Sequence, residues 1–78
     1  MSRFMTLAYI LERYGPRLDK HQLAKVLGLS AGTVMNHVSA GTLGIPTYTE
    51  HGKTWASAEA VADHLATKHD EATAAAAG

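Results

Sequence analysis

Apolar positions recur with a helical period at the start of the chain. From about Phe4 to Tyr14, large apolar side chains return every three or four residues, and a Gly-Pro pair follows. We therefore predict a helix over residues 4–14 whose apolar stripe faces the core. The stripe comprises Phe4, Leu7, Ala8, Leu11 and Tyr14, widened by Met5 and Ile10.

Two shorter helices are predicted over residues 20–40. Asp19 and Gln22 have the spacing of a capping box, so the first of the two begins directly after Asp19. Gly28 supplies the left-handed residue that ends this helix, and Ser30 is a good N-cap for the next one. Only three residues then separate the two helices.

The remaining sequence predicts a hairpin and a last helix. Thr-rich and aromatic runs on both sides of a Gly-containing turn are typical of a β-hairpin, here over residues 46–56. Because two strands alone are marginally stable, we expect this hairpin to lean on the helices through Trp55 and Ile45. A last helix is predicted over residues 58–69. Residues 70–78 are Ala-rich and are expected to be disordered or frayed.

Composition is consistent with a single small domain, which we place at residues 1–69. The chain has 78 residues, of which 46% are hydrophobic, but 14 of these are alanines, so the core is small. The absence of cysteine excludes disulfide scaffolds, Cys-containing zinc sites and thiol nucleophiles, and makes a reducing cytoplasm the expected location. No apolar stretch is long enough for a membrane helix.

Charge is balanced overall but unevenly distributed. Seven Lys and Arg against seven Asp and Glu give a net charge of zero, which argues against a general polyanion-binding protein. Residues 1–53 nevertheless carry six basic and three acidic side chains, whereas residues 54–78 carry one basic and four acidic ones. An anionic partner is therefore expected to meet the first two-thirds of the chain.

The two short helices have the lengths, capping residues and short turn of a helix-turn-helix, a motif that places its second helix in the DNA major groove. With Lys20 as the first position of the twenty-residue unit, Ala24 is fifth, where a small residue lets the helices approach. Gly28 is ninth, where the turn requires a positive φ, and Leu29 and Val34 are the apolar tenth and fifteenth positions. This agreement favours DNA binding over the alternative, a plain helical hairpin used for protein contact.

The chain resembles a known family over residues 18–66. The resemblance rests on Gln22 to Ser30, Thr33-Val34, Val38, Gly41-Thr42-Leu43, Pro46 and Lys53-Thr54-Trp55. It is similar to the small winged helix-turn-helix proteins of the phage excisionase and AlpA type, which are related in fold to the DNA-binding domain of MerR regulators. The first helix and the Gly-Ile-Pro connector also resemble pyocin activator proteins. The resemblance implies a mainly α fold with a small β-hairpin, a winged helix-turn-helix.

The implied function is sequence-specific binding of double-stranded DNA, as a small transcriptional regulator or excisionase-like architectural factor of a phage or mobile element. Asn36 has the groups that bind adenine bidentately, Thr33 offers a methyl group to thymine, and Gly32 permits close approach. The candidate base-reading residues are Ser30, Ala31, Gly32, Thr33, Asn36 and His37. The candidate phosphate or minor-groove contacts are Arg17, Lys20, Lys25, His51 and Lys53. The plain alternatives are an Asn that is only solvated and lysines on a wet helix face.

The sequence offers few candidate metal-binding or catalytic residues. The five histidines lack the four-residue ligand spacing, and carboxylates and serines lack a catalytic arrangement, so we predict no metal, no cofactor and no enzymatic activity. The second helix of the pair contains no Lys or Arg, unlike many members of the resembled family. That departure supports a second hypothesis, a non-enzymatic protein-interaction module, either an adaptor or an inhibitor.

Partners follow from the same features. The wide apolar stripe of the first helix predicts a homodimer or a cooperative multimer on DNA. Neither a membrane nor a small-molecule ligand is expected as a partner, and a DNA-binding role would place the protein at the nucleoid.

Overall fold

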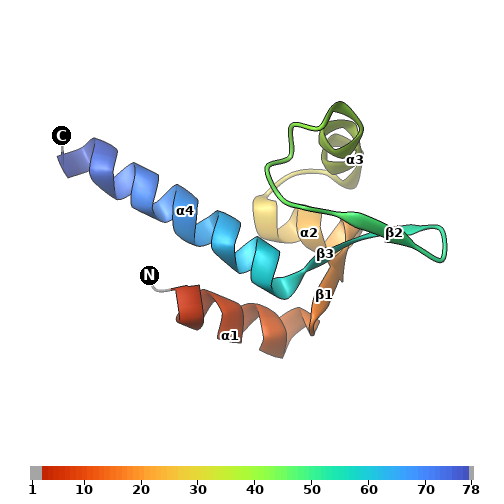
Figure 1. The fold of residues 1–78 in the computed structure, drawn as a ribbon, viewed down its shortest axis with the longest axis horizontal. Helices are drawn as coiled ribbons and strands as arrows, with labels where there is room; N and C mark the ends of the chain where they lie inside the picture. Colours follow the sequence, from red (N-terminus) through yellow and green to blue (C-terminus); the bar gives the residue numbers. More distant parts are fainter. Residues whose placement is uncertain (1–2, 78) are drawn as a thin grey trace.

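The computed structural model describes residues 3–77, which form four helices around a small three-stranded antiparallel sheet (Figure 1). The helices are α1 (Arg3–Tyr14), α2 (Lys20–Leu27), α3 (Ala31–Ala40) and α4 (Ala58–Ala77). The strands are β1 (Arg17–Asp19), β2 (Tyr48–Glu50) and β3 (Lys53–Ser57). The prediction of a mainly α chain with a small β-hairpin is confirmed at this level. No described helix is both long and apolar enough to cross a membrane.

The sheet contains one strand more than the sequence predicts. β3 lies between β1 and β2, with Leu18 opposite Ala56 on one side and Tyr48 opposite Trp55 on the other. β1 has three residues, too few to produce an alternating pattern, and it forms because the fully buried Leu18 joins the core beside Ala56. The predicted hairpin is present as β2 and β3, but the sequence did not predict β1, through which the hairpin is attached to the body.

The ends of α2 and α3 follow the predicted capping chemistry. The Gln22 N–H donates to the Asp19 carboxylate at 2.9 Å, and the Asp19 N–H donates to the Gln22 side chain at 3.1 Å. Gly28 ends α2 with a φ of 72°, and the Leu29 N–H donates to the Ala24 carbonyl at 2.9 Å. Ser30 caps α3. The predicted pair of helices over residues 20–40 is present, with the expected three-residue connection.

The core draws on every helix and on the sheet. The helix pair contributes Leu23, Ala24 and Val34, and Ile45 joins them from the connector before β2. The remaining buried apolar residues are Ile10, Leu18, Ala56, Ala58, Val61 and Ala62. Trp55 is only half-buried, so of the two predicted hairpin anchors Ile45 is in the core and Trp55 lies at its edge.

α1 buries only part of the predicted stripe. Ile10 is buried and Leu7 and Tyr14 pack against the core, whereas Phe4 is 75% exposed and Leu11 is 45% exposed. α1 contacts the body mainly through α4, so only one narrow side of its wide apolar surface is covered. The helix is apolar on more sides than α4 covers, and the sequence pattern alone does not select among them.

α4 continues well past its predicted end at residue 69. The segment expected to be disordered or frayed, residues 70–78, instead continues the helix to Ala77, while Gly78 lies outside the described residues. Alanine has the highest intrinsic helix propensity, so this segment needs no core contact to continue the helix already begun. In Figure 1, this part of α4 projects from the body past the start of α1 and gives the molecule its 43 Å long axis.

Candidate nucleic-acid interface

α3 lies at the edge of the molecule with one face open. Val34 is fully buried and holds the helix to the core, while Gly32, Asn36 and Ser39, four and three residues apart, are exposed. Figure 1 shows α3 beside the start of the hairpin, at the opposite end of the molecule from the projecting end of α4. The exposed face of α3 carries no charged side chain, and α4 does not cover it.

The first turn of α3 is held in place by hydroxyl groups. The Thr33 N–H donates to the Ser30 Oγ at 3.1 Å, and the two hydroxyl oxygens lie 2.8 Å apart. Ser30 and Gly32 are exposed, whereas Ala31 is half-buried against the core. The structure therefore leaves Ser30, Gly32 and part of Thr33 accessible at the start of the helix and turns Ala31 inward.

His37 lies at the other end of α3. It is half-buried, and its Nδ1 is 2.9 Å from the Thr42 hydroxyl, just past the end of the helix. This contact fixes the ring beside the turn at Gly41, where the chain leaves the helix with a φ of 72°. Of the predicted base-reading residues, Asn36 is the one with a long polar side chain on the exposed face.

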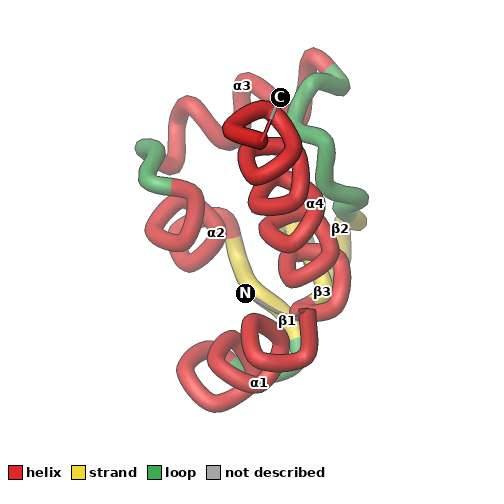
Figure 2. Tube along the Cα trace, turned by 90° about the vertical axis from the view of Figure 1, so that its left-hand side faces the viewer, coloured by secondary structure: helices red, strands yellow, loops and turns green. Residues whose placement is uncertain are grey.

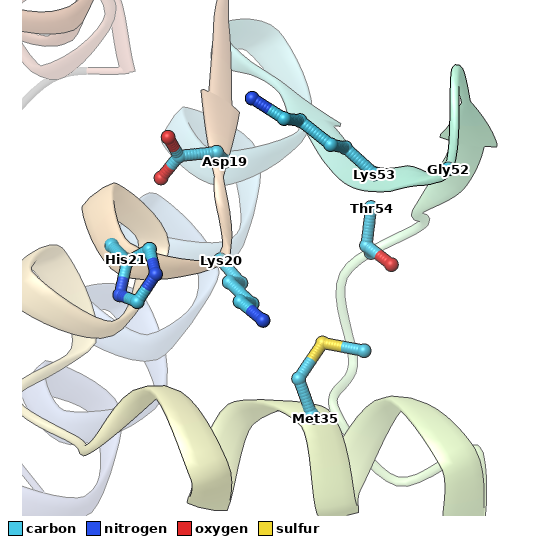
Figure 3. Close-up of a pocket in the computed structure, with 7 residues that line it drawn as sticks. All are labelled: Asp19, Lys20, His21, Met35, Gly52, Lys53 and Thr54. Atoms are coloured by element: carbon cyan, nitrogen blue, oxygen red, sulfur yellow. The ribbon is translucent and has the colours of Figure 1, made fainter.

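A cleft of about 250 Å³ opens between the start of α2, the middle of α3 and the tip of the hairpin (Figure 3). We call it the lysine cleft; it is lined by Asp19, Lys20, His21, Met35, Gly52, Lys53 and Thr54. Lys20 and Lys53 are exposed and form no ion pair within residues 3–77. The Asp19 carboxylate is engaged in capping α2. The lysine cleft thus contains two lysines without ion pairs: the Lys20 ammonium points toward Met35 of α3, and the Lys53 side chain extends past Asp19, away from α3 (Figure 3).

Arg17 is placed differently from these lysines. Its guanidinium donates to the Glu50 carboxylate at 2.9 Å and lies 3.8 Å from the centre of the Trp55 ring. The hydrogen bonds to Glu50 and then Tyr48 raise the pKa of Arg17 above its ordinary value, so the side chain stays charged across the neutral range. Arg17 therefore joins β1 to the hairpin, and its charge is already compensated by Glu50.

Two other predicted contacts lie outside the lysine cleft. His51 is at the hairpin tip with a φ of 54°, and its Nε2 is 3.9 Å from the Glu50 carboxylate. Lys25 faces a separate groove beside α1. The predicted cationic residues are thus divided by the fold: Lys20 and Lys53 share the lysine cleft, whereas Arg17 lies with His51 near Glu50, apart from Lys25.

The residues that complete the lysine cleft were not predicted from the sequence. His21, Met35 and Thr54 line one cleft only because β3 pairs with β1, the strand that leads into α2. Met35 could have been included among the candidate residues from the sequence, because it directly precedes Asn36 on the helix proposed to bind DNA. No sequence signal links Thr54 to α3, because their proximity depends on the sheet.

The chain matches no protein-family model, no curated protein and no solved structure. Within the described residues, no group of three His, Asp or Glu side chains converges in a way that would hold a metal ion. The open face of α3 and the lysine cleft are the features of this surface that could bind a partner.

Proposed function

We propose that this protein binds double-stranded DNA as a winged helix-turn-helix domain, in the role of a small transcriptional regulator or architectural factor. One observation carries the proposal: the open, uncharged face of α3 lies beside the lysine cleft, whose two lysines form no ion pair within residues 3–77. A neutral polar face suits the base edges of the major groove, and flanking ammonium groups suit the phosphates on either side.

In this proposal α3 enters the major groove. Asn36 binds an adenine through its amide, Thr33 or Met35 contacts a thymine methyl group, and Gly32 lets the helix approach the base edges. The hydrogen bonds between Ser30 and Thr33 hold the first turn rigid, which lowers the ordering cost of binding.

Lys20 and Lys53 bind backbone phosphates on the flank of the groove. They extend from two different elements, the start of α2 and the hairpin, and so fix the orientation of α3 on the duplex. With two such contacts, affinity should fall about tenfold between 50 and 200 mM salt, which is a weak dependence for a DNA-binding protein.

A second candidate function is a protein-interaction module on the same fold. The observation that favours it is the absence of Lys, Arg, Asp and Glu from α3, together with a formal net charge of zero for the chain. In that case α3 and Met35 would contact a protein surface, and Lys20 and Lys53 would lie at the rim of the contact.

The two functions can be distinguished by selecting binding sequences from a random-sequence DNA duplex library. Fluorescence anisotropy then measures the affinity of the protein and its variants for the enriched duplex. We expect one enriched motif, a loss of about tenfold or more for Asn36→Ala that is largest on that motif, and an equal loss on all sequences for Lys53→Ala. Lys68→Ala is the matched control, because Lys68 is on α4 and pairs with Glu71. Absence of any enriched sequence, with Asn36→Ala binding as wild type, would exclude the DNA function and leave the protein-interaction module.

A further inference from the structure

A second surface lies between α1, α2 and α4, away from the residues of the lysine cleft. It is a groove of about 590 Å³ lined by Met5, Thr6, Tyr9, Ile10, Arg13, Tyr14, Lys25, Val26 and Leu65, which we call the α1 groove. Met5 is 69% exposed and Tyr9 is 57% exposed, although both are large and apolar or aromatic. An exposed apolar surface of this kind on a small domain is typical of an interaction site.

The charged side chains lining the α1 groove are all basic. Arg13 and Lys25 line it, and no carboxylate does. Neither side chain forms an ion pair with another residue of the described chain, although the Arg13 guanidinium lies 5.9 Å from the Tyr9 ring. The groove therefore suits an occupant that is slim, weakly apolar and acidic.

The projecting end of α4 has these properties. Arg3 pairs with Asp63 where the start of α1 meets α4, and the side chains of residues 67–76 beyond that point are all exposed. We call residues 67–77 the C-terminal arm. It carries Asp70 and Glu71 against one basic side chain, Lys68, whose Nζ lies 3.3 Å from Glu71, so the arm is negative overall. This ion pair is exposed and therefore weak, so Glu71 can exchange it for a partner on a second copy. Every residue of the arm after Glu71 is Ala or Thr, so the arm is a narrow helix about 16 Å long.

The C-terminal arm cannot reach the groove of its own chain while α4 remains a continuous helix. Figures 1 and 2 show that it leaves the body in the direction away from α1 and α2, toward the viewer in Figure 2. A second copy of the chain can reach the groove from that side. Short helical segments in water gain most of their stability from packing, so an arm with no covering surface gains by docking.

We propose that the protein forms a symmetric dimer in which the C-terminal arm of each copy lies in the α1 groove of the other. A two-fold axis makes the contact reciprocal, so both grooves are filled and the assembly is closed. Asp70 and Glu71 of one copy then face Arg13 and Lys25 of the other, and the alanines pack on Met5 and Tyr9. The opposite net charges of the first 53 and the last 25 residues agree with this arrangement.

The proposal does not depend on DNA binding and is tested without DNA by analytical ultracentrifugation from micromolar to near-millimolar concentration. We expect a reversible monomer–dimer equilibrium. Reversing the arm charges, with Asp70→Lys and Glu71→Lys, should raise the dissociation constant about tenfold or more, as should Arg13→Glu with Lys25→Glu. Combining all four changes should restore the constant to within about threefold of wild type, because the attraction is regained with opposite signs.

Two controls test whether the charges at this interface, and not a general change of charge or a loss of folding, weaken the dimer. Lys20→Glu with Lys53→Glu lowers the net charge by as much as Arg13→Glu with Lys25→Glu, but in the lysine cleft, and should leave the dissociation constant unchanged. Circular dichroism checks that each variant is folded, which is expected since all four positions are exposed.

Three results would overturn the proposal. One is a monomer at every concentration. Another is a dimer that survives truncation after His69 and is lost instead with Phe4→Ser and Leu11→Ser, which would assign the interface to the other side of α1. The third is the failure of the fourfold variant to regain the affinity lost in either pair.

Discussion

The surface around α3 and the surface around α1 share one small core but differ in what they expose. α3 leaves a neutral polar face bordered by the unpaired Lys20 and Lys53. α1 leaves large apolar side chains, Met5 and Tyr9 among them, bordered by Arg13 and Lys25. A neutral polar face beside cations suits a hydrated polyanion, whereas an apolar face beside cations suits a desolvated acidic helix.

This difference shows why a count of basic residues says little about this protein. Five of its seven Lys and Arg residues are divided among three environments: the lysine cleft, the α1 groove and the Arg17–Glu50 pair. In the first two the charge is available to a partner, and in the third it is already used to hold the hairpin. The fold determines which groups surround each cation, and those groups determine whether the cation can bind a partner.

The largest effect is expected from a core substitution that destabilises the fold and so disrupts the surfaces around α3 and α1 together. Leu18 is fully buried on β1, where it joins the hairpin to the helices, so Leu18→Ala should lower the free energy of unfolding by about 3 kcal/mol. Urea denaturation followed by circular dichroism measures this loss. Leu29→Ala is the control, because Leu29 is 41% exposed and should lose less than about 1 kcal/mol. Equal losses at the two positions would show that β1 does not join the two parts.

Substitutions at two glycines, one at the end of α2 and one in α3, distinguish an effect on stability from an effect on binding. Gly28 has a φ of 72° and no atom within 4 Å of an added Cβ, so Gly28→Ala should lose about 1 kcal/mol through backbone strain alone. Gly32 lies in α3 with equally open space, so Gly32→Ala should gain about 0.5–1 kcal/mol of stability. Thermal denaturation measures both. If α3 approaches DNA closely, Gly32→Ala weakens binding despite the gain; unchanged affinity would place Gly32 outside the interface.

A smaller effect is expected at the joint between β1 and the hairpin. Arg17→Ala removes the guanidinium 3.8 Å from the Trp55 ring, so the emission of the single tryptophan should shift to longer wavelength as water replaces it. Arg17→Lys keeps the charge without the planar group and should shift almost as far. An unchanged spectrum in Arg17→Ala would mean that the stacking is not maintained in solution.

The pH dependence of the same joint follows from the hydrogen bond to Glu50. Because that bond raises the pKa of Arg17 in the folded protein, its stabilising effect is complete below the ordinary arginine range. The stabilising effect is lost only as the pH rises through the raised pKa of Arg17, in strongly alkaline solution. The tryptophan emission should therefore remain constant from about pH 6 to 9, and a change within that window that Arg17→Lys abolishes would contradict this.

The smallest effect on the core is expected from the C-terminal arm. Ala72→Gly with Ala75→Gly should reduce the far-ultraviolet helical signal, since each substitution costs about 1 kcal/mol of helix propensity. The side chains of residues 67–76 are exposed and outside the core, so the urea midpoint of the monomer should hardly move. A clear fall in that midpoint at low protein concentration would mean that the arm folds back on its own chain.

Much of the local structure was predictable from the sequence. The capping box at Asp19 and Gln22, the left-handed Gly28 and the Ser30 cap depend on neighbours three or four residues away, and the structure confirms all three. The same holds for the open face of α3, because burial of Val34 implies exposure of Asn36, which is turned to the opposite side of the helix.

The errors involve contacts between distant residues or a surplus of apolar surface. The strand at Leu18 is too short to have a periodic pattern, and its pairing partner is 38 residues away at Ala56. The predicted stripe of α1 was too wide: it included the buried Ile10 but also the exposed Phe4 and Leu11, because only the position of α4 selects among these apolar residues.

By itself the sequence determined where α2 and α3 begin and end and which of their residues are polar. These properties arise from interactions within one or two helical turns. The tertiary structure decided which cations are paired, which side of α1 is covered, and that Lys53 lies near Lys20 and Met35. Those outcomes depend on the packing of the sheet against the helices, in which residues far apart in the chain compete for the same small core.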